Sequence, residues 1–172
     1  MEKDTQIVNR VAASNLTTFD LEELHTPGER VLFDIKHNLF QGLILKELYF
    51  RNFIRDNNWP QFTGKHVAIT CTADAIVPTW AFMLLATALH PFAETIVFGS
   101  SEDLERHLFQ QKLNTIEWSK FTNKKVIIKG CSKVLVPVAA YVETVNRLRP
   151  FAASIMFGEA CSTVPLYKQK IA

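Results

Sequence analysis

The chain contains three cysteines, and the same short pattern follows each of them. Cys71, Cys131 and Cys161 each precede a Ser or Thr, and Val-Pro comes within the next seven residues. A thiol near a helix N-terminus ionises more readily, because the helix dipole and free N–H groups stabilise the thiolate. Three converging thiolates are suitable ligands for zinc or an iron–sulfur cluster. The pattern predicts a metal or thiol site at these cysteines, with Asp74 as a fourth ligand or a base.

Two other interpretations of the same segments stay open. The backbone N–H groups and hydroxyls of Thr72, Ser132 and Ser162 could bind a small anion, with the thiols incidental. A free cysteine is also a small hydrophobic residue that suits a strand end beneath a helix. The residues expected to wall a pocket beside the thiols are Pro78, Trp80 and Pro137.

The composition predicts one soluble, cytoplasmic domain. The chain has 172 residues, of which 48% are hydrophobic and 21% charged, and this excludes a disordered or fibrous protein. Three cysteines are too few for a disulfide framework. The first residues, MEKDTQIVNR, include no apolar signal-peptide core. The most apolar stretch, 75–89, is shorter than the ~20 residues that a membrane helix needs.

The charge distribution and the missing motifs exclude several classes of function. Residues 1–103 have a net charge of −5 and residues 104–172 a net charge of +7. The basic residues are dispersed and lack an aromatic stacking motif, which disfavours nucleic acid as a partner. The sequence contains no G-x-G-x-x-G, Walker A or G-x-S-x-G motif, so dinucleotide binding, P-loop chemistry and a serine hydrolase are disfavoured. Whether the protein is an enzyme stays open.

An internal repeat organises the chain. Residues 65–99 align without gaps to residues 124–158, with 13 of 35 positions identical. The identities include Val-Pro near the middle of each segment and Pro-Phe-Ala and Phe-Gly near its end. A single register over so many positions indicates a duplicated unit.

Periodicity predicts the elements of each unit. Short β-branched runs predict buried strands, and longer apolar runs bounded by proline predict helices. The expected helices are 46–56, 77–89, 102–113 and 136–148, and the expected strands are 67–70, 95–98, 126–128 and 154–157. The fold class is therefore α/β, with two tandem α-β-α-β repeats that share one mainly parallel sheet.

The expected domain plan places the whole chain, 1–172, in a single domain. Its parts are an N-terminal extension (1–44), repeat unit one (45–99), repeat unit two (104–158) and a tail (159–172). The extension is expected to contain a helix at 4–13 and a strand at 31–35. Because the carboxyl ends of parallel strands meet at one edge of a sheet, all three cysteines are expected at the same edge.

Three segments carry a resemblance to a known family. CTADAIVPTWAFMLL, KKVIIKGCSK and SIMFGEACSTVPLYK resemble the bacterial family catalogued as domain of unknown function 2480. The resemblance covers nearly the whole chain. Members of that family often sit beside genes for iron–sulfur cluster assembly, so the resemblance implies an accessory role there, with the assembly proteins as partners.

Two alternative functions remain beside this one. The first is a small-anion binding module, with the donors named above. The second is a non-catalytic structural protein, a homo-oligomer whose subunit interface uses exposed aromatic residues. The aromatic residues expected at that interface are Phe40, Tyr49 and Phe53.

Overall fold

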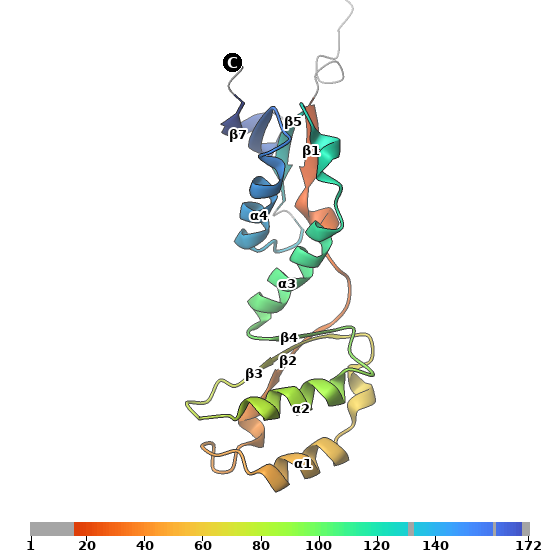
Figure 1. Cartoon of the computed structure of the whole chain (residues 1–172), viewed down its shortest axis with the longest axis vertical. Helices are drawn as coiled ribbons and strands as arrows, with labels where there is room; N and C mark the ends of the chain where they lie inside the picture. Colours follow the sequence, from red (N-terminus) through yellow and green to blue (C-terminus); the bar gives the residue numbers. More distant parts are fainter. Residues whose placement is uncertain (1–15, 131–132, 160, 170–172) are drawn as a thin grey trace, which may run out of the picture. The chain divides into compact units, whose positions relative to one another are not determined.

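The computed structural model describes residues 16–130, 133–159 and 161–169, which form two compact mixed α/β units (Figure 1). The central unit consists of residues 26–108. The terminal unit consists of the described residues up to His25 and from Phe109 onward. The helix predicted at 4–13 lies outside the described residues. Within the described part of the chain, no helix has the length and apolar character needed to span a membrane.

The central unit contains a three-stranded parallel sheet in the order β2-β3-β4. The middle strand is buried on both faces: Val67 packs with Leu85 in one core cluster, and Ala68 packs with Leu104 in another. Figure 1 shows α1 and α2 on one side of this sheet. The elements are β2 (Arg30–Asp34), α1 (Glu47–Asp56), β3 (His66–Thr70), α2 (Thr79–Leu89), β4 (Thr95–Phe98) and the first part of α3 (Ser101–Asn114).

The terminal unit contains a four-stranded sheet in the order β1-β5-β6-β7. Its first three strands are parallel, and β7 pairs antiparallel with β6. Val126 and Ile128 of β5 belong to the core cluster, together with Phe109 and Leu148. The elements are β1 (Leu16–Asp20), the last part of α3, β5 (Lys125–Lys129), α4 (Val138–Leu148), β6 (Ser154–Glu159) and β7 (Ser162–Lys168).

The expectation of one shared sheet is wrong, because the described strands form two sheets. The segment expected to be an extension supplies an edge strand to each of them. Strand β1 pairs with β5, and β2 pairs with β3. Each predicted repeat unit therefore completes its sheet with one strand from the segment that precedes both units. The mixed α/β class and the predominance of parallel pairing are confirmed.

The predicted helices after the first strand of each unit are confirmed, and proline defines where they begin. Pro78 and Pro137 precede the first helical residue in extended backbone conformations, with φ near −60° and ψ near 140°. A proline can stand there because the first N–H groups of a helix have no intrahelical acceptor.

Short 3-10 helices hold the chain on its way into the strands. In η3 (Trp59–Phe62), the indole N–H of Trp59 donates to the carbonyl of Ile54 at 2.7 Å. In η4 (Trp118–Phe121), Trp118 donates in the same way to Leu113 at 3.3 Å. Each indole ties the end of a helix to the segment that enters the next strand. The ends of α1 and η3 are thereby fixed side by side.

Candidate functional site

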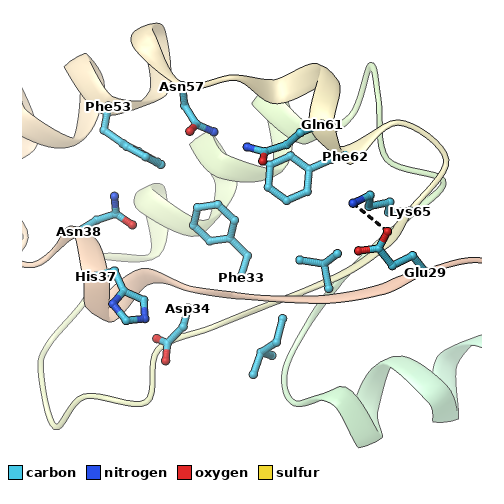
Figure 2. A pocket seen from close by; sticks show the side chains of 12 residues that line it. Glu29, Phe33, Asp34, His37, Asn38, Phe53, Asn57, Gln61, Phe62 and Lys65 are labelled. Carbon is cyan, nitrogen blue, oxygen red and sulfur yellow. Dashed lines mark ion pairs between the residues drawn. The ribbon is translucent and has the colours of Figure 1, made fainter.

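A groove of about 430 Å³ runs along strand β2 in the central unit (Figure 2). We call it the β2 groove. Its volume lies in the range of small-ligand sites. Strand β2, η2 (Ile35–Asn38), the end of α1 and η3 form its walls. Its lining residues are Glu29, Val31, Leu32, Phe33, Asp34, His37, Asn38, Phe53, Asn57, Gln61, Phe62 and Lys65.

One wall of the β2 groove is aromatic. The ring of Phe33 lies 6.2 Å from that of Phe53, 6.2 Å from that of Trp59 and 6.0 Å from that of Phe62, measured between centroids. Trp59 and Phe62 belong to the buried core of the unit. The wall is therefore fixed by packing and offers a preformed apolar surface.

Three primary amides supply the polar side of the groove. Figure 2 shows Asn57 and Gln61 above the Phe33 ring and Asn38 beside it. The backbone of Asn57 is fully used, since its N–H donates to Phe53 and its carbonyl accepts from Trp59. Its side-chain nitrogen Nδ2 is enclosed and has no hydrogen-bond partner. A buried donor left unpaired costs about 1–3 kcal/mol, so an acceptor that reaches this atom would stabilise the protein.

Charged groups lie at the two ends of the groove. At one end, Lys65 Nζ forms an ion pair with Glu29 Oε2 at 2.8 Å. At the other end lie Asp34 and His37 (Figure 2). The lining between these ends comes from uncharged residues of β2, α1 and η3. The groove is thus suited to a ligand with an uncharged middle.

Asp34 fastens the end of β2 to the loop that follows β3. Its carboxylate accepts from the backbone N–H of Lys36 at 3.0 Å, the N–H of Thr72 at 3.1 Å and the hydroxyl of Thr72 at 2.6 Å. Lys36 Nζ lies 3.3 Å away. Burial raises the pKa of Asp34, but these hydrogen bonds outweigh it and lower the pKa to about 2.

The same loop holds three of the predicted site residues. Cys71 is partly buried against the core of the central unit, and its Sγ lies 3.8 Å from the carbonyl of Ala73. Thr72 gives both of its donors to Asp34, so an external anion would compete there with an internal carboxylate. Asp74 is exposed.

The other predicted thiol residues lie elsewhere. Cys161 is exposed in the turn between β6 and β7, and Ser162 is the first residue of β7. Cys131 and Ser132 lie outside the described residues. Cys71 follows a strand of the three-stranded sheet, whereas Cys161 follows a strand of the four-stranded one. The expectation that all three cysteines share one edge of one sheet is therefore wrong. In the described ranges, no three His, Cys, Asp or Glu side chains form a group that could hold a metal.

The two described thiols are expected to differ in reactivity. Cys161 should react with iodoacetamide about tenfold faster than Cys71, because exposure governs access of the reagent to the thiol. Peptide-level mass spectrometry follows each cysteine separately. The variants Cys161→Ser and Cys71→Ser assign the fast and slow phases. Equal rates at both positions would contradict the burial of Cys71.

The predicted wall residues have structural positions. Trp80 packs edge-on against Phe50 at 6.1 Å and lies 5.6 Å from the guanidinium of Arg51. Pro78 and Pro137 begin α2 and α4. The aromatic residues expected at a subunit interface differ in exposure. The side chains of Phe40 and Tyr49 are exposed, whereas Phe53 is partly buried in the wall of the β2 groove.

The terminal unit has a smaller cavity of about 270 Å³. Among the described residues, its lining contains no amide or charged side chain that could orient a ligand, which makes it the weaker candidate. Its lining residues are Ile128, Val138, Tyr141, Val145, Phe157 and Leu166.

Comparison with known proteins identifies a family but no activity. The family model described as protein of unknown function (DUF2480) matches residues 5–169. The chain therefore belongs to this family, as the resemblance of its motifs implied. No curated protein and no solved structure matches it.

Proposed function

We propose that this member of the DUF2480 family is a ligand-binding protein whose binding site is the β2 groove. One observation supports it most directly: the enclosed Nδ2 of Asn57 lacks an acceptor, although the backbone N–H and C=O of this residue are both paired. Buried polar groups in folded proteins are nearly always satisfied, so an exception in a groove calls for a partner that the ligand would supply. The aromatic wall gives such a ligand an apolar surface to pack on.

We also propose that the two units are copies of one ancestral unit. The elements η4, β5, α4 and β6 each begin 59 residues after η3, β3, α2 and β4, respectively. This constant offset supports a duplication. The first strands correspond as well. Asp20 and Asp34 each end a strand and accept a hydrogen bond from the amide two residues on.

The correspondence between the units supports the groove as a specialised site. The 59-residue offset places Asn57 opposite Ile116. The match of Asp34 with Asp20 places Asn38 opposite Leu24. Both aliphatic residues pack against the core cluster of the terminal unit. The central unit therefore has two amides where its counterpart has two hydrophobic side chains. Such an exchange supplies hydrogen-bonding groups for a ligand, and at Asn57, whose Nδ2 is enclosed and unpaired, it also lowers stability.

A titration with N-acetylphenylalaninamide tests this function, because the probe has one aromatic ring and two amides. We expect amide chemical shifts to change along the β2 groove and the change to be lost in Asn57→Ile. Asn58→Ile is the matched control, since the neighbouring Asn58 is exposed and does not line the groove. Shift changes confined to other parts of the chain, or unchanged binding by Asn57→Ile, would overturn the proposal.

A second candidate function is metal or sulfur handling by the cysteines in the cytoplasm, with iron–sulfur assembly proteins as partners. The exposed thiol of Cys161 supports it, because a partner could reach that residue. A shared site would also need Cys131. Anaerobic purification followed by metal and labile-sulfide analysis tests this candidate. Bound metal near one equivalent that disappears in Cys131→Ala supports it, and metal-free protein contradicts it.

A further inference from the structure

We infer that the ligand of the β2 groove is an extended peptide segment that adds a strand to the outer edge of β2. This inference rests on the proposed function of the groove and specifies its ligand class. Peptides bind in this way where a sheet edge and side-chain pockets lie together, since main-chain hydrogen bonds give affinity and the pockets give specificity.

Strand β2 has an edge available for pairing. It is the outer strand of the order β2-β3-β4, and among the described strands only β3 pairs with it. An edge strand presents a row of backbone donors and acceptors that serves as a template for another chain. Leu32, in the middle of β2, is 46% exposed, so the described residues leave this position of the strand open to solvent.

The hydrogen-bond pattern shows which backbone groups face outward. The N–H of His66 in β3 donates to the carbonyl of Glu29 at 2.9 Å. Because successive residues of a strand direct their N–H and C=O groups to opposite edges, Val31 and Phe33 also face β3. The backbone groups of Leu32 and Asp34 therefore point away from β3.

The groove follows the backbone of β2 rather than one face of the sheet. The four consecutive residues 31–34 all line it. Side chains of successive strand residues point to opposite faces, so a cavity on a single face would touch only alternate residues. A cavity lined by all four is expected where the groove opens onto the edge of the strand. A partner strand laid there would occupy the groove along its length.

The opposite wall is suited to a peptide backbone and an apolar side chain. Asn57 and Gln61 are primary amides, which donate and accept like peptide groups. The Nδ2 of Asn57 would donate to a peptide carbonyl. The rings of Phe33 and Phe62 would pack on an apolar side chain of the peptide (Figure 2). Because the charged groups lie at the ends of the groove, the central residues of the peptide should be uncharged.

Two matched peptides test the inference. The probe is a peptide about as long as the five-residue strand β2, with an acetylated N-terminus and an amidated C-terminus. Threonine and valine alternate along the peptide, and phenylalanine is its central residue. Its control has one N-methyl group on a backbone amide that would face β2. The control has the same side chains but lacks one main-chain donor. We expect its dissociation constant to be about five- to tenfold higher, as the loss of one hydrogen bond predicts.

Two protein variants test the same contact from the other side. Leu32→Pro removes the outward N–H of β2, and an edge strand tolerates proline where the N–H is not used in the ladder. Leu32→Thr shortens the side chain but keeps that N–H. We expect Leu32→Thr to bind the unmethylated peptide and Leu32→Pro to bind it at least about fivefold more weakly. The N-methyl comparison on the wild-type protein remains decisive if Leu32→Pro fails to fold.

The outcomes separate this inference from the proposed function. If both peptides and N-acetylphenylalaninamide bind in the groove with no effect of N-methylation, the groove is a ligand site and strand addition is wrong. If neither the peptides nor the small probe shifts groove resonances, the proposed function is wrong as well. Peptide-induced shifts confined to β4 or to the terminal unit would contradict strand addition at β2.

Discussion

The Asn57→Ile variant is expected to be more stable than the wild-type protein by about 1 kcal/mol and unable to bind ligand. The wild-type side chain buries an Nδ2 donor without an acceptor. Replacing an unsatisfied polar group by an apolar one removes that desolvation cost. Isoleucine is the residue at the corresponding position of the terminal unit, Ile116, where it packs against the core. A gain in stability with a loss of binding is typical of residues selected for function.

Urea unfolding measures the first half of this prediction. We expect a higher midpoint with an unchanged m-value, because the variant and the wild-type protein expose about the same surface area on unfolding. Asn38→Leu is a suitable comparison, since Asn38 also lines the groove but has no enclosed unpaired atom among those described. Its stability should change by less than about 0.5 kcal/mol. A destabilised Asn57→Ile protein would show that the amide is satisfied in the folded chain.

The second large effect concerns Asp34, whose replacement by Asn is expected to cost about 1–2 kcal/mol at neutral pH. The carboxylate accepts hydrogen bonds from Lys36 and Thr72, and these hold its pKa at about 2 against an ordinary value of 3.8. A folded-state pKa below the unfolded value means that the ionised form stabilises the fold. This contribution is complete above about pH 4 and is lost as the pH falls toward 2.

The pH dependence distinguishes this effect from a simple packing defect. The difference in unfolding free energy between wild type and Asp34→Asn should shrink as the pH is lowered through that window. Asp74→Asn is the matched control, because Asp74 is an exposed carboxylate in the loop that Asp34 anchors. Its replacement should change stability by less than about 0.5 kcal/mol at every pH. A constant difference for Asp34→Asn between pH 7 and pH 2.5 would contradict the assigned role.

The local elements were predictable because local chemistry determines them. Pro78 and Pro137 precede apolar runs of helical length, and the helices begin at the next residue. The β-branched runs after residues 65 and 124 form the buried strands β3 and β5. In each case the pattern needs only the chain within a few residues of itself.

The pairing of the strands was not predictable in the same way. Periodicity identifies a strand but does not name its neighbour, so β3 and β5 were wrongly assigned to one sheet. One signal could have helped. Phe19-Asp20-Leu21 and Phe33-Asp34-Ile35 repeat a short pattern at the ends of β1 and β2. Two copies of that pattern indicate two first strands, one for each sheet.

The β2 groove was also missed, because its walls come from segments that are separate in the sequence. Asn38, Asn57 and Gln61 follow no motif with a recognised spacing. The pattern around the cysteines predicted a reactive site, although Cys71 packs against the core. The internal alignment contained a usable signal, since Asn57 lies opposite Ile116. A polar residue where its counterpart is apolar and partly buried in a core points to a functional site.

The most direct test of the central claim is a pair of chemical-shift titrations with N-acetylphenylalaninamide, on the wild-type protein and on Asn57→Ile. We expect the largest changes in the wild type at Leu32, Phe33, Asn57 and Gln61 and none at these residues in the variant. Equal affinity in the two proteins, or changes confined to the four-stranded sheet of the terminal unit, would contradict it.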